Sequence, residues 1–121
     1  MPFFLVTYVH PDPDGWRTYL APHLTWIGAQ VEAGALRASG PTFTGDARSA
    51  ALIFHSSDRS ALLATLATDP YVENGQVSEM TITQWDPIFG IFNDGSTQRG
   101  RTTEEIIDDI LATFDLSRPH E

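Results

Sequence analysis

The sequence of 121 residues predicts an α+β domain of the ferredoxin-like type, with the element order β-α-β-β-α-β. Four short runs are rich in β-branched and aromatic residues, which is typical of strands. Two segments between these runs repeat their apolar residues at the spacing of a helix. The runs that predict strands are residues 3–9, 35–44, 50–54 and 76–85.

The first predicted helix follows a break at residues 11–15, where two prolines and a glycine end the first strand. The apolar stripe that we expect to face the core consists of Leu20, Leu24, Ile27 and Val31. Gly34 is a natural stop after the last turn. Pro22 lies inside the segment, so the helix either kinks there or starts afresh with Pro22 in its first turn.

The second and fourth strands are each predicted with an irregularity. Ser39-Gly40-Pro41 interrupts the second strand, where the glycine permits a bulge. The apolar residues of 76–85 do not alternate strictly, which also favours a bulge. The continuous apolar run of residues 50–54 indicates a central position in the sheet.

The second predicted helix lies between residues 57 and 69. Either Ser57 or Asp58 is suited to its N-cap. The helix ends at Asp69, because the residue before a proline avoids the helical region of backbone space. Its inward-facing residues are predicted to be Leu62, Leu63 and Leu66.

We divide the chain into a domain of residues 1–95 and a C-terminal extension of residues 96–121. Thr102 and Glu105 form the pattern of a capping box at the start of a third helix. The apolar stripe of that helix comprises Ile106, Ile107, Ile110, Leu111 and Phe114. A short helix with such a stripe is unstable alone in water, so it should pack on its own domain or on a partner subunit.

The predicted sheet carries two helices on one face and leaves the other face bare. A bare sheet face is usually buried in an interface, and a second copy of the chain is the usual partner. We therefore expect a homodimer or a larger homo-oligomer.

The composition excludes several classes of function. The net charge is −9 and the seven basic residues form no cluster, so we expect neither a nucleic-acid nor a membrane partner. Cysteine is absent, which excludes disulfides and thiolate chemistry. No stretch approaches the about 18 apolar residues of a membrane span, and the N-terminus lacks the pattern of a signal peptide. We expect a cytoplasmic protein.

The sequence places a histidine, His23, near the start of the first helix and a carboxylate, Asp69, in the turn after the second helix. If the fold brings these two ends together, they form a pair that moves protons near neutral pH. The alternative for His23 is a histidine that only bonds to a neighbour, and the alternative for Asp69 is a turn residue before proline.

Four further residues are candidates for binding a ligand, namely Ser39, Trp26, Tyr71 and Arg17. Ser39 offers a hydroxyl beside the free backbone of Gly40, although a plain bulge is the other interpretation. The aromatic rings either line a pocket or pack in the core. The four histidines show no metal-ligand spacing, and no phosphate loop is present, so we predict no metal and no cofactor.

Four short motifs in order resemble the YCII-related (YciI-like) family. They are His23-Leu24, residues 34–41, Asp69-Pro70-Tyr71 and residues 84–87. The resemblance implies a ferredoxin-like fold that dimerises through its sheets as an α+β barrel. It implies that His23 and Asp69 line a shared cleft. Members of the family often carry an arginine close before the histidine, and here the nearest is Arg17.

Some members of this family are linked to the breakdown of substituted aromatic rings, including a dehydrochlorinase-type activity. We therefore predict a cofactor-independent enzyme that uses His23 and Asp69 for elimination or isomerisation on a small cyclic or aromatic, anionic or hydroxylated compound. The alternatives are a non-catalytic module that binds a small ligand and a structural dimer module.

Overall fold

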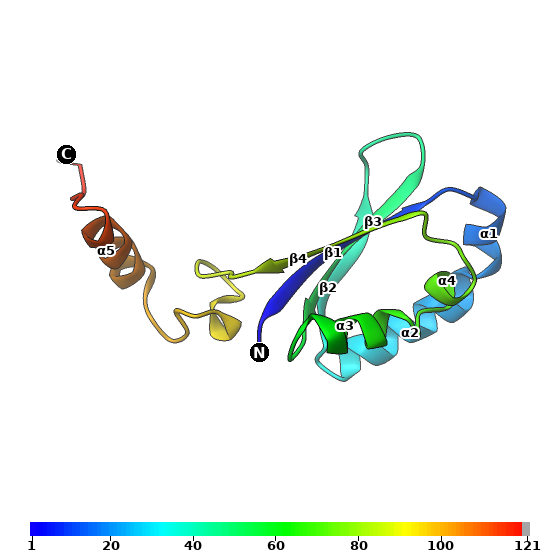
Figure 1. Ribbon diagram of the computed structural model, residues 1–121, viewed down its shortest axis with the longest axis horizontal. Coiled ribbons are helices and arrows are strands. Elements are labelled where there is room, and N and C mark those ends of the chain that lie inside the picture. Colours follow the sequence, from blue (N-terminus) through cyan, green and yellow to red (C-terminus); the bar gives the residue numbers. More distant parts are fainter. Residues whose placement is uncertain (120–121) are drawn as a thin grey trace. The chain divides into compact units, whose positions relative to one another are not determined.

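The computed structural model describes residues 1–119, which fall into two compact units that divide between Trp85 and Asp86. The first unit is one four-stranded sheet whose helices all cover the same face (Figure 1). The sequence-based boundary after residue 95 stays a prediction. The elements of the first unit are β1 (Phe3–His10), α1 (Pro13–Thr18), α2 (Leu20–Glu32), β2 (Leu36–Thr42), β3 (Arg48–His55), α3 (Arg59–Leu66), α4 (Pro70–Glu73) and β4 (Glu79–Trp85).

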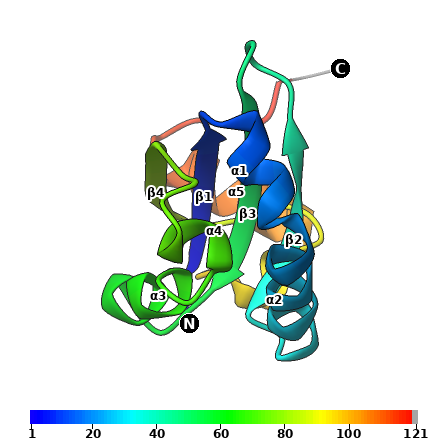
Figure 2. The same ribbon diagram turned by 90° about the vertical axis from the view of Figure 1, so that its right-hand side faces the viewer.

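The strand order is β2-β3-β1-β4, and every neighbouring pair is antiparallel. This is the ferredoxin-like arrangement, so the predicted fold class is confirmed. β3 lies inside the sheet as its continuous apolar run indicates, and β1 lies between β3 and β4. Figure 2 shows α1, α2, α3 and α4 in front of the strands.

Two short helices were not predicted. α1 forms inside the segment that the sequence marks as a break, because Pro13 occupies its first turn and the side chain of Asp12 caps it by accepting from the N–H of Asp14 at 3.0 Å. α4 begins directly after Asp69, which is its N-cap. A proline after a capping carboxylate therefore starts a helix at both places.

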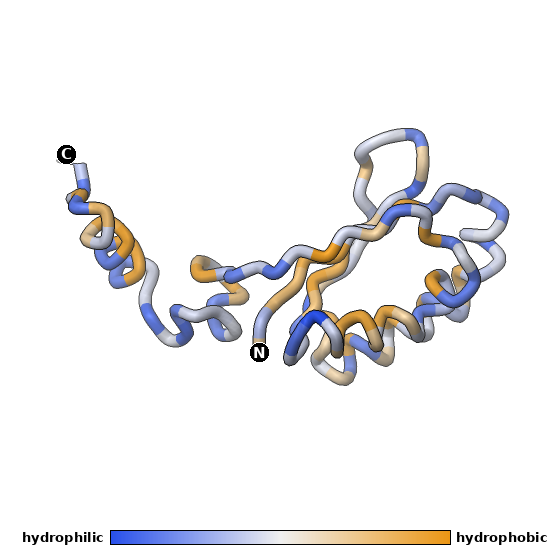
Figure 3. The backbone as a smooth tube through the Cα atoms, in the orientation of Figure 1, coloured by the Kyte–Doolittle hydropathy of each residue, from blue (hydrophilic) through white to orange (hydrophobic). Residues whose placement is uncertain are grey.

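The core lies between the sheet and the helices. The buried side chains of its cluster are Phe4, Val6, Tyr8, Trp26, Leu36, Leu52, Phe54, Leu62 and Leu66. Along β1 they alternate with residues of the opposite face, as a half-covered sheet requires. Figure 3 shows apolar residues along the strands of the sheet.

The predicted inner stripe of α2 is wrong at two positions. Leu24 is 55% exposed and Val31 is 54% exposed, whereas Trp26 is buried. The indole turns inward because its Nε1–H donates to the hydroxyl of Thr68 at 2.8 Å while its ring packs in the core. The side of the helix that faces the core is therefore displaced by about one residue from the predicted stripe, so that Trp26 faces inward and Leu24 does not. α2 begins at Leu20, and Pro22 lies within its first turn.

Smaller predictions also need correction. Asp58 is the N-cap of α3 and accepts from the N–H of Ala61 at 2.7 Å, but Leu63 is 45% exposed rather than inward-facing. The register shift of β2 lies between Leu36 and Ala38 and not at Ser39-Gly40-Pro41. The bulge predicted in residues 76–85 is absent from the pairing of β4 with β1, which has no register shift. Gly34 follows α2 with a φ of 78°, as its predicted stop requires.

No helix covers the opposite face of the sheet within the first unit (Figure 2). The strand alternation places Leu5, Val9 and Ile53 on this face, each only half-buried. Thr7 and Thr81 also lie there and bond to each other through their hydroxyls. We call this set of residues the open face.

The second unit contains a short 3₁₀ turn, η1 (Asn93–Gly95), and the helix α5 (Thr103–Thr113). The predicted capping box is present, with Thr102 and Glu105 each bonded to the other's backbone N–H. Ile106 is buried, whereas Ile110 and Phe114 are exposed. Among the described residues, no helix is long and apolar enough to cross a membrane.

Candidate active site

His23 and Asp69 are in direct contact, 2.8 Å apart between Nδ1 and Oδ1. His23 lies at the end of the first turn of α2, where its N–H bonds to the carbonyl of Tyr19. Asp69 is the N-cap of α4, which packs against α2. The two helix starts therefore meet, as the pair requires.

The carboxylate of Asp69 is 0% exposed and accepts three hydrogen bonds. Oδ1 accepts from the backbone N–H of Tyr71 at 3.0 Å as well as from His23. Oδ2 accepts from the hydroxyl of Tyr8 at 3.0 Å. Burial, followed by the charge of Asp69, raises the pKa of Tyr8, which keeps its hydroxyl protonated as a donor. The buried carboxylate is thus fully partnered.

This arrangement fixes the tautomer of His23. The carboxylate of Asp69 offers only acceptors, so Nδ1 of His23 carries a hydrogen, and in the neutral ring Nε2 has a free lone pair. The imidazole also stacks on the ring of Tyr71, with centroids 4.2 Å apart and planes inclined by 24°. The side chain is 13% exposed, so a part of the ring can be reached by a ligand.

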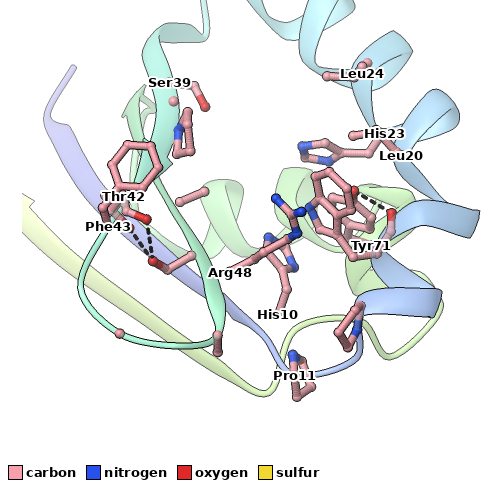
Figure 4. Close-up of a pocket in the computed structure, with 18 of the residues that line it drawn as sticks. His10, Pro11, Leu20, His23, Leu24, Ser39, Thr42, Phe43, Arg48 and Tyr71 are labelled. Atoms are coloured by element: carbon pink, nitrogen blue, oxygen red, sulfur yellow. Dashed lines mark hydrogen bonds between the residues drawn. The ribbon is translucent and has the colours of Figure 1, made fainter.

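The exposed part of His23 faces a cavity of about 1040 Å³ between the helices and the β2–β3 hairpin. His23 and Tyr71 form one wall and Ser39, Thr42 and Phe43 form the opposite wall (Figure 4). Most of the lining is apolar, with a few polar groups that converge from different elements. This is the usual character of a small-molecule site.

The ligand-binding candidates are placed differently from one another. Ser39 and Tyr71 line the cavity. Trp26 lies in the core, with its ring centroid 6.1 Å from that of His23, and does not line the cavity. Arg17 is exposed on α1 and is also outside the lining. Trp16, another aromatic residue of α1, also lines the cavity.

Sequence reasoning missed three residues of the site. Tyr8 follows the alternation of Phe4 and Val6 and therefore resembles a plain core residue, although its hydroxyl needs a buried partner. His10 ends β1 and donates from Nδ1 to the carbonyl of Gln76 at 2.8 Å. Arg48 begins β3 next to a turn, and its guanidinium lies over the ring of Trp16, 4.0 Å from the centroid.

The model of one protein family, the YCII-related domain, matches residues 1–86. The chain belongs to this family. The matched range contains the whole sheet, α1 to α4, and the His23–Asp69 pair. The resemblance that the four motifs suggested is thereby confirmed for this YCII-related protein.

A solved structure shows the same fold. The 5-chloro-2-hydroxyhydroquinone dehydrochlorinase from Burkholderia phenoliruptrix AC1100, in complex with 2,5-dihydroxybenzoquinone, is similar with a TM-score of 0.59 and 18% identity, over 69% of this chain and 93% of that one. An uncharacterized NIPSNAP domain protein from Burkholderia xenovorans aligns with a TM-score of 0.44 and 20% identity, over 72% and 94% of the two chains. A search of curated proteins finds no match.

Proposed function

We propose that this YCII-related protein is a cofactor-independent enzyme that transfers a proton on a small ring compound. The observation that carries the proposal is the 2.8 Å bond between His23 and the buried Asp69 at the wall of the cavity. The bond leaves Nε2 of His23 as a base that can reach a ligand. Asp69 holds the ring in place and stabilises the imidazolium that forms when Nε2 takes a proton.

The reaction that fits these groups begins with removal of a C–H proton by Nε2 of His23. The electron pair of that bond then forms a double bond to the neighbouring carbon. In an elimination, a leaving group departs from that carbon with its own electron pair. In an isomerisation, the neighbouring carbon already carries a double bond, whose electron pair shifts to the next carbon, and that carbon takes the proton back from the imidazolium. Neither course needs a nucleophile from the protein, and each requires only a base and a pocket with a few polar groups that hold the ligand.

The structural likeness supports the elimination. By its name, the similar Burkholderia phenoliruptrix protein is a dehydrochlorinase of a hydroxylated ring. Loss of hydrogen chloride is an elimination of the kind described. At 18% identity the likeness shows the fold alone. The proposed chemistry therefore rests on the residues of this chain.

The test is turnover of ring acids, phenols and lactones, chosen first by their stabilisation of the wild type against heat. His23→Asn retains an amide N–H near the position of Nδ1 and can still donate to Asp69, but it lacks Nε2. We expect its turnover to fall by about 10²-fold or more while its melting temperature stays close to that of the wild type. The matched control is Thr25→Ala, an exposed residue of the same helix. Unchanged turnover in His23→Asn contradicts the proposal, and binding without turnover supports a non-catalytic binding module.

We also propose a cytoplasmic homodimer that buries the open face. A second copy is the occupant because a half-buried aliphatic centre, with Leu5, Val9 and Ile53, faces away from the helices. Ile53→Glu should convert a dimer into a monomer in light scattering after size-exclusion chromatography. Ala64→Glu, on the exposed side of α3, is the control for added charge. A wild-type monomer at high micromolar concentration contradicts the dimer.

A further inference from the structure

His10 and Arg48 are direct cross-strand partners at the end of the sheet where the cavity opens. The preceding pair on the same face is Tyr8 with Ala50, and Tyr8 is part of the core. Because side chains alternate along strands, His10 and Arg48 also lie on the helix-covered face. Both line the cavity, and Figure 4 shows them next to each other, between the two walls.

Arg48 is a cation without an acidic partner. None of the ion pairs among the described residues involves it, whereas Arg101 and Arg118 are each held by two carboxylates. Its guanidinium lies over the ring of Trp16, which fixes the position of the group and leaves its N–H edges free. Of the described cavity residues, Asp46 alone is acidic, and it lies exposed in the hairpin loop.

His10 offers a hydrogen-bond acceptor to the cavity, whereas Arg48 offers donors. Its Nδ1–H is used by the carbonyl of Gln76, so Nε2 is an acceptor when the ring is neutral. Burial is the largest cause of the lowered pKa of His10, and the charge of Arg48, like that of His23 in its protonated form, acts in the same direction. These effects outweigh the raising effects of the Gln76 carbonyl and Asp69. His10 is therefore neutral near pH 7.5.

The rest of the lining suits a flat ring. Trp16, Leu20 and Phe43 supply apolar surface around the space between His23 and Arg48. The cavity volume of about 1040 Å³ exceeds what one substituted ring needs. A ligand bound by Arg48 at one end therefore has room to place a ring carbon near Nε2 of His23.

We propose that Arg48 and His10 form the recognition end of the cavity and that the ligand is a ring compound with a carboxylate and a hydroxyl. Arg48 binds the carboxylate through parallel N–H bonds, which the planar guanidinium favours. The ligand hydroxyl donates to Nε2 of His10. This inference rests on the proposed function for the reaction at His23, but the recognition itself is a matter of binding.

The test measures affinity by calorimetry at pH 7.5 with three probes, benzoate, benzamide and 3-hydroxybenzoate. Benzamide has the shape of benzoate without its charge. We expect the wild type to bind benzoate about tenfold more tightly than benzamide, because a charged hydrogen bond is lost with the amide. Arg48→Gln should abolish this preference, and Arg59→Gln, which changes an exposed arginine of α3 outside the cavity, should retain it.

His10→Asn tests the second contact. The asparagine can still donate to the carbonyl of Gln76, but it has no counterpart of Nε2. We expect 3-hydroxybenzoate to bind the wild type about fivefold more tightly than benzoate. The gain should disappear in His10→Asn while the preference for benzoate over benzamide remains.

Three results would overturn the inference: equal affinity of the wild type for benzoate and benzamide, a preference that survives in Arg48→Gln, or no binding of any probe at millimolar concentration. Its failure is distinguishable from failure of the proposed function. His23→Asn should lose turnover and retain the carboxylate preference, whereas Arg48→Gln should lose the preference at the level of binding.

Discussion

Tyr71 positions His23 both by direct contact and through Asp69. Its ring stacks on the imidazole with centroids 4.2 Å apart, and its backbone N–H donates to Oδ1 of Asp69, the same oxygen to which His23 bonds. The hydroxyl of Tyr71 in turn donates to the carbonyl of Trp16 at 2.8 Å, which connects α4 to α1. The start of α4 therefore positions the imidazole through both its side chain and its backbone.

Removing the hydroxyl of Tyr8 should destabilise the protein. In Tyr8→Phe the buried Oδ2 of Asp69 loses its donor, and we expect the free energy of unfolding to fall by about 1 to 3 kcal/mol. Urea denaturation measures the change. In an Asp69→Asn background the same substitution should cost less, since the buried charge is gone. Equal costs in the two backgrounds would show that the hydroxyl and the carboxylate do not act together.

Acid should weaken the fold through His10. Its pKa is lower in the folded protein than in the unfolded chain, so between the two values the unfolded chain binds more protons. The contribution of His10 to stability is therefore complete above about pH 6.5 and declines as the pH falls below that value. Urea denaturation at pH 7.5 and 5.5 should show a smaller pH effect in His10→Asn than in the wild type. An identical pH effect in both proteins would show that His10 does not cause the loss of stability in acid.

Strong alkali should unfold the protein through its buried tyrosines. Burial, followed by the charge of Asp69, raises the pKa of Tyr71 to about 12, and the pKa of Tyr8 is also raised. The unfolded chain loses these protons from about pH 10, so stability declines as the pH rises above that value. Tyrosinate absorbance at 295 nm should rise together with the loss of circular dichroism. Tyr8→Phe should make the decline shallower. A steeper decline in this variant would be evidence that Tyr8 does not cause the loss of stability in alkali.

Helix α5 should depend on its capping box. Thr102→Ala removes the side-chain acceptor of the Glu105 N–H, and we expect a loss of about 1 kcal/mol in the local stability of the helix. Amide hydrogen exchange at Glu105 and Ile106 measures this directly. Thr102→Ser retains the hydroxyl and is the matched control. Equal exchange in the alanine and serine variants would mean that the cap does not hold the helix.

The strands could be predicted because they depend on local patterns, and the meeting of His23 with Asp69 could be expected because the resemblance to the family implied a shared cleft. Strand positions follow from apolar runs, and an Asp before a Pro is a boundary signal wherever it occurs. The inner side of α2 could not be predicted in this way. It depends on the bond between Trp26 and Thr68, which joins segments 42 residues apart. A stripe of aliphatic residues does not indicate such a contact.

The partnership of His10 and Arg48 lay beyond sequence reasoning for a related reason. Which residue of β3 lies opposite His10 is set by the register of two strands that are not consecutive in the chain. A shift of one residue would turn Arg48 to the open face. Only the assembled sheet shows that a histidine at the end of one strand and an arginine at the start of another share one cavity.

Asp69 serves the fold and the site with the same two oxygen atoms, since it caps α4 and holds His23 and Tyr8. A descendant that no longer processes a substrate would still need this carboxylate to fold. Selection for folding alone therefore retains Asp69, and its presence in a related sequence is not evidence of activity. No backbone hydrogen bond depends on the imidazole of His23, so among relatives this is the position whose loss would remove the proposed base and leave the cap of α4 in place.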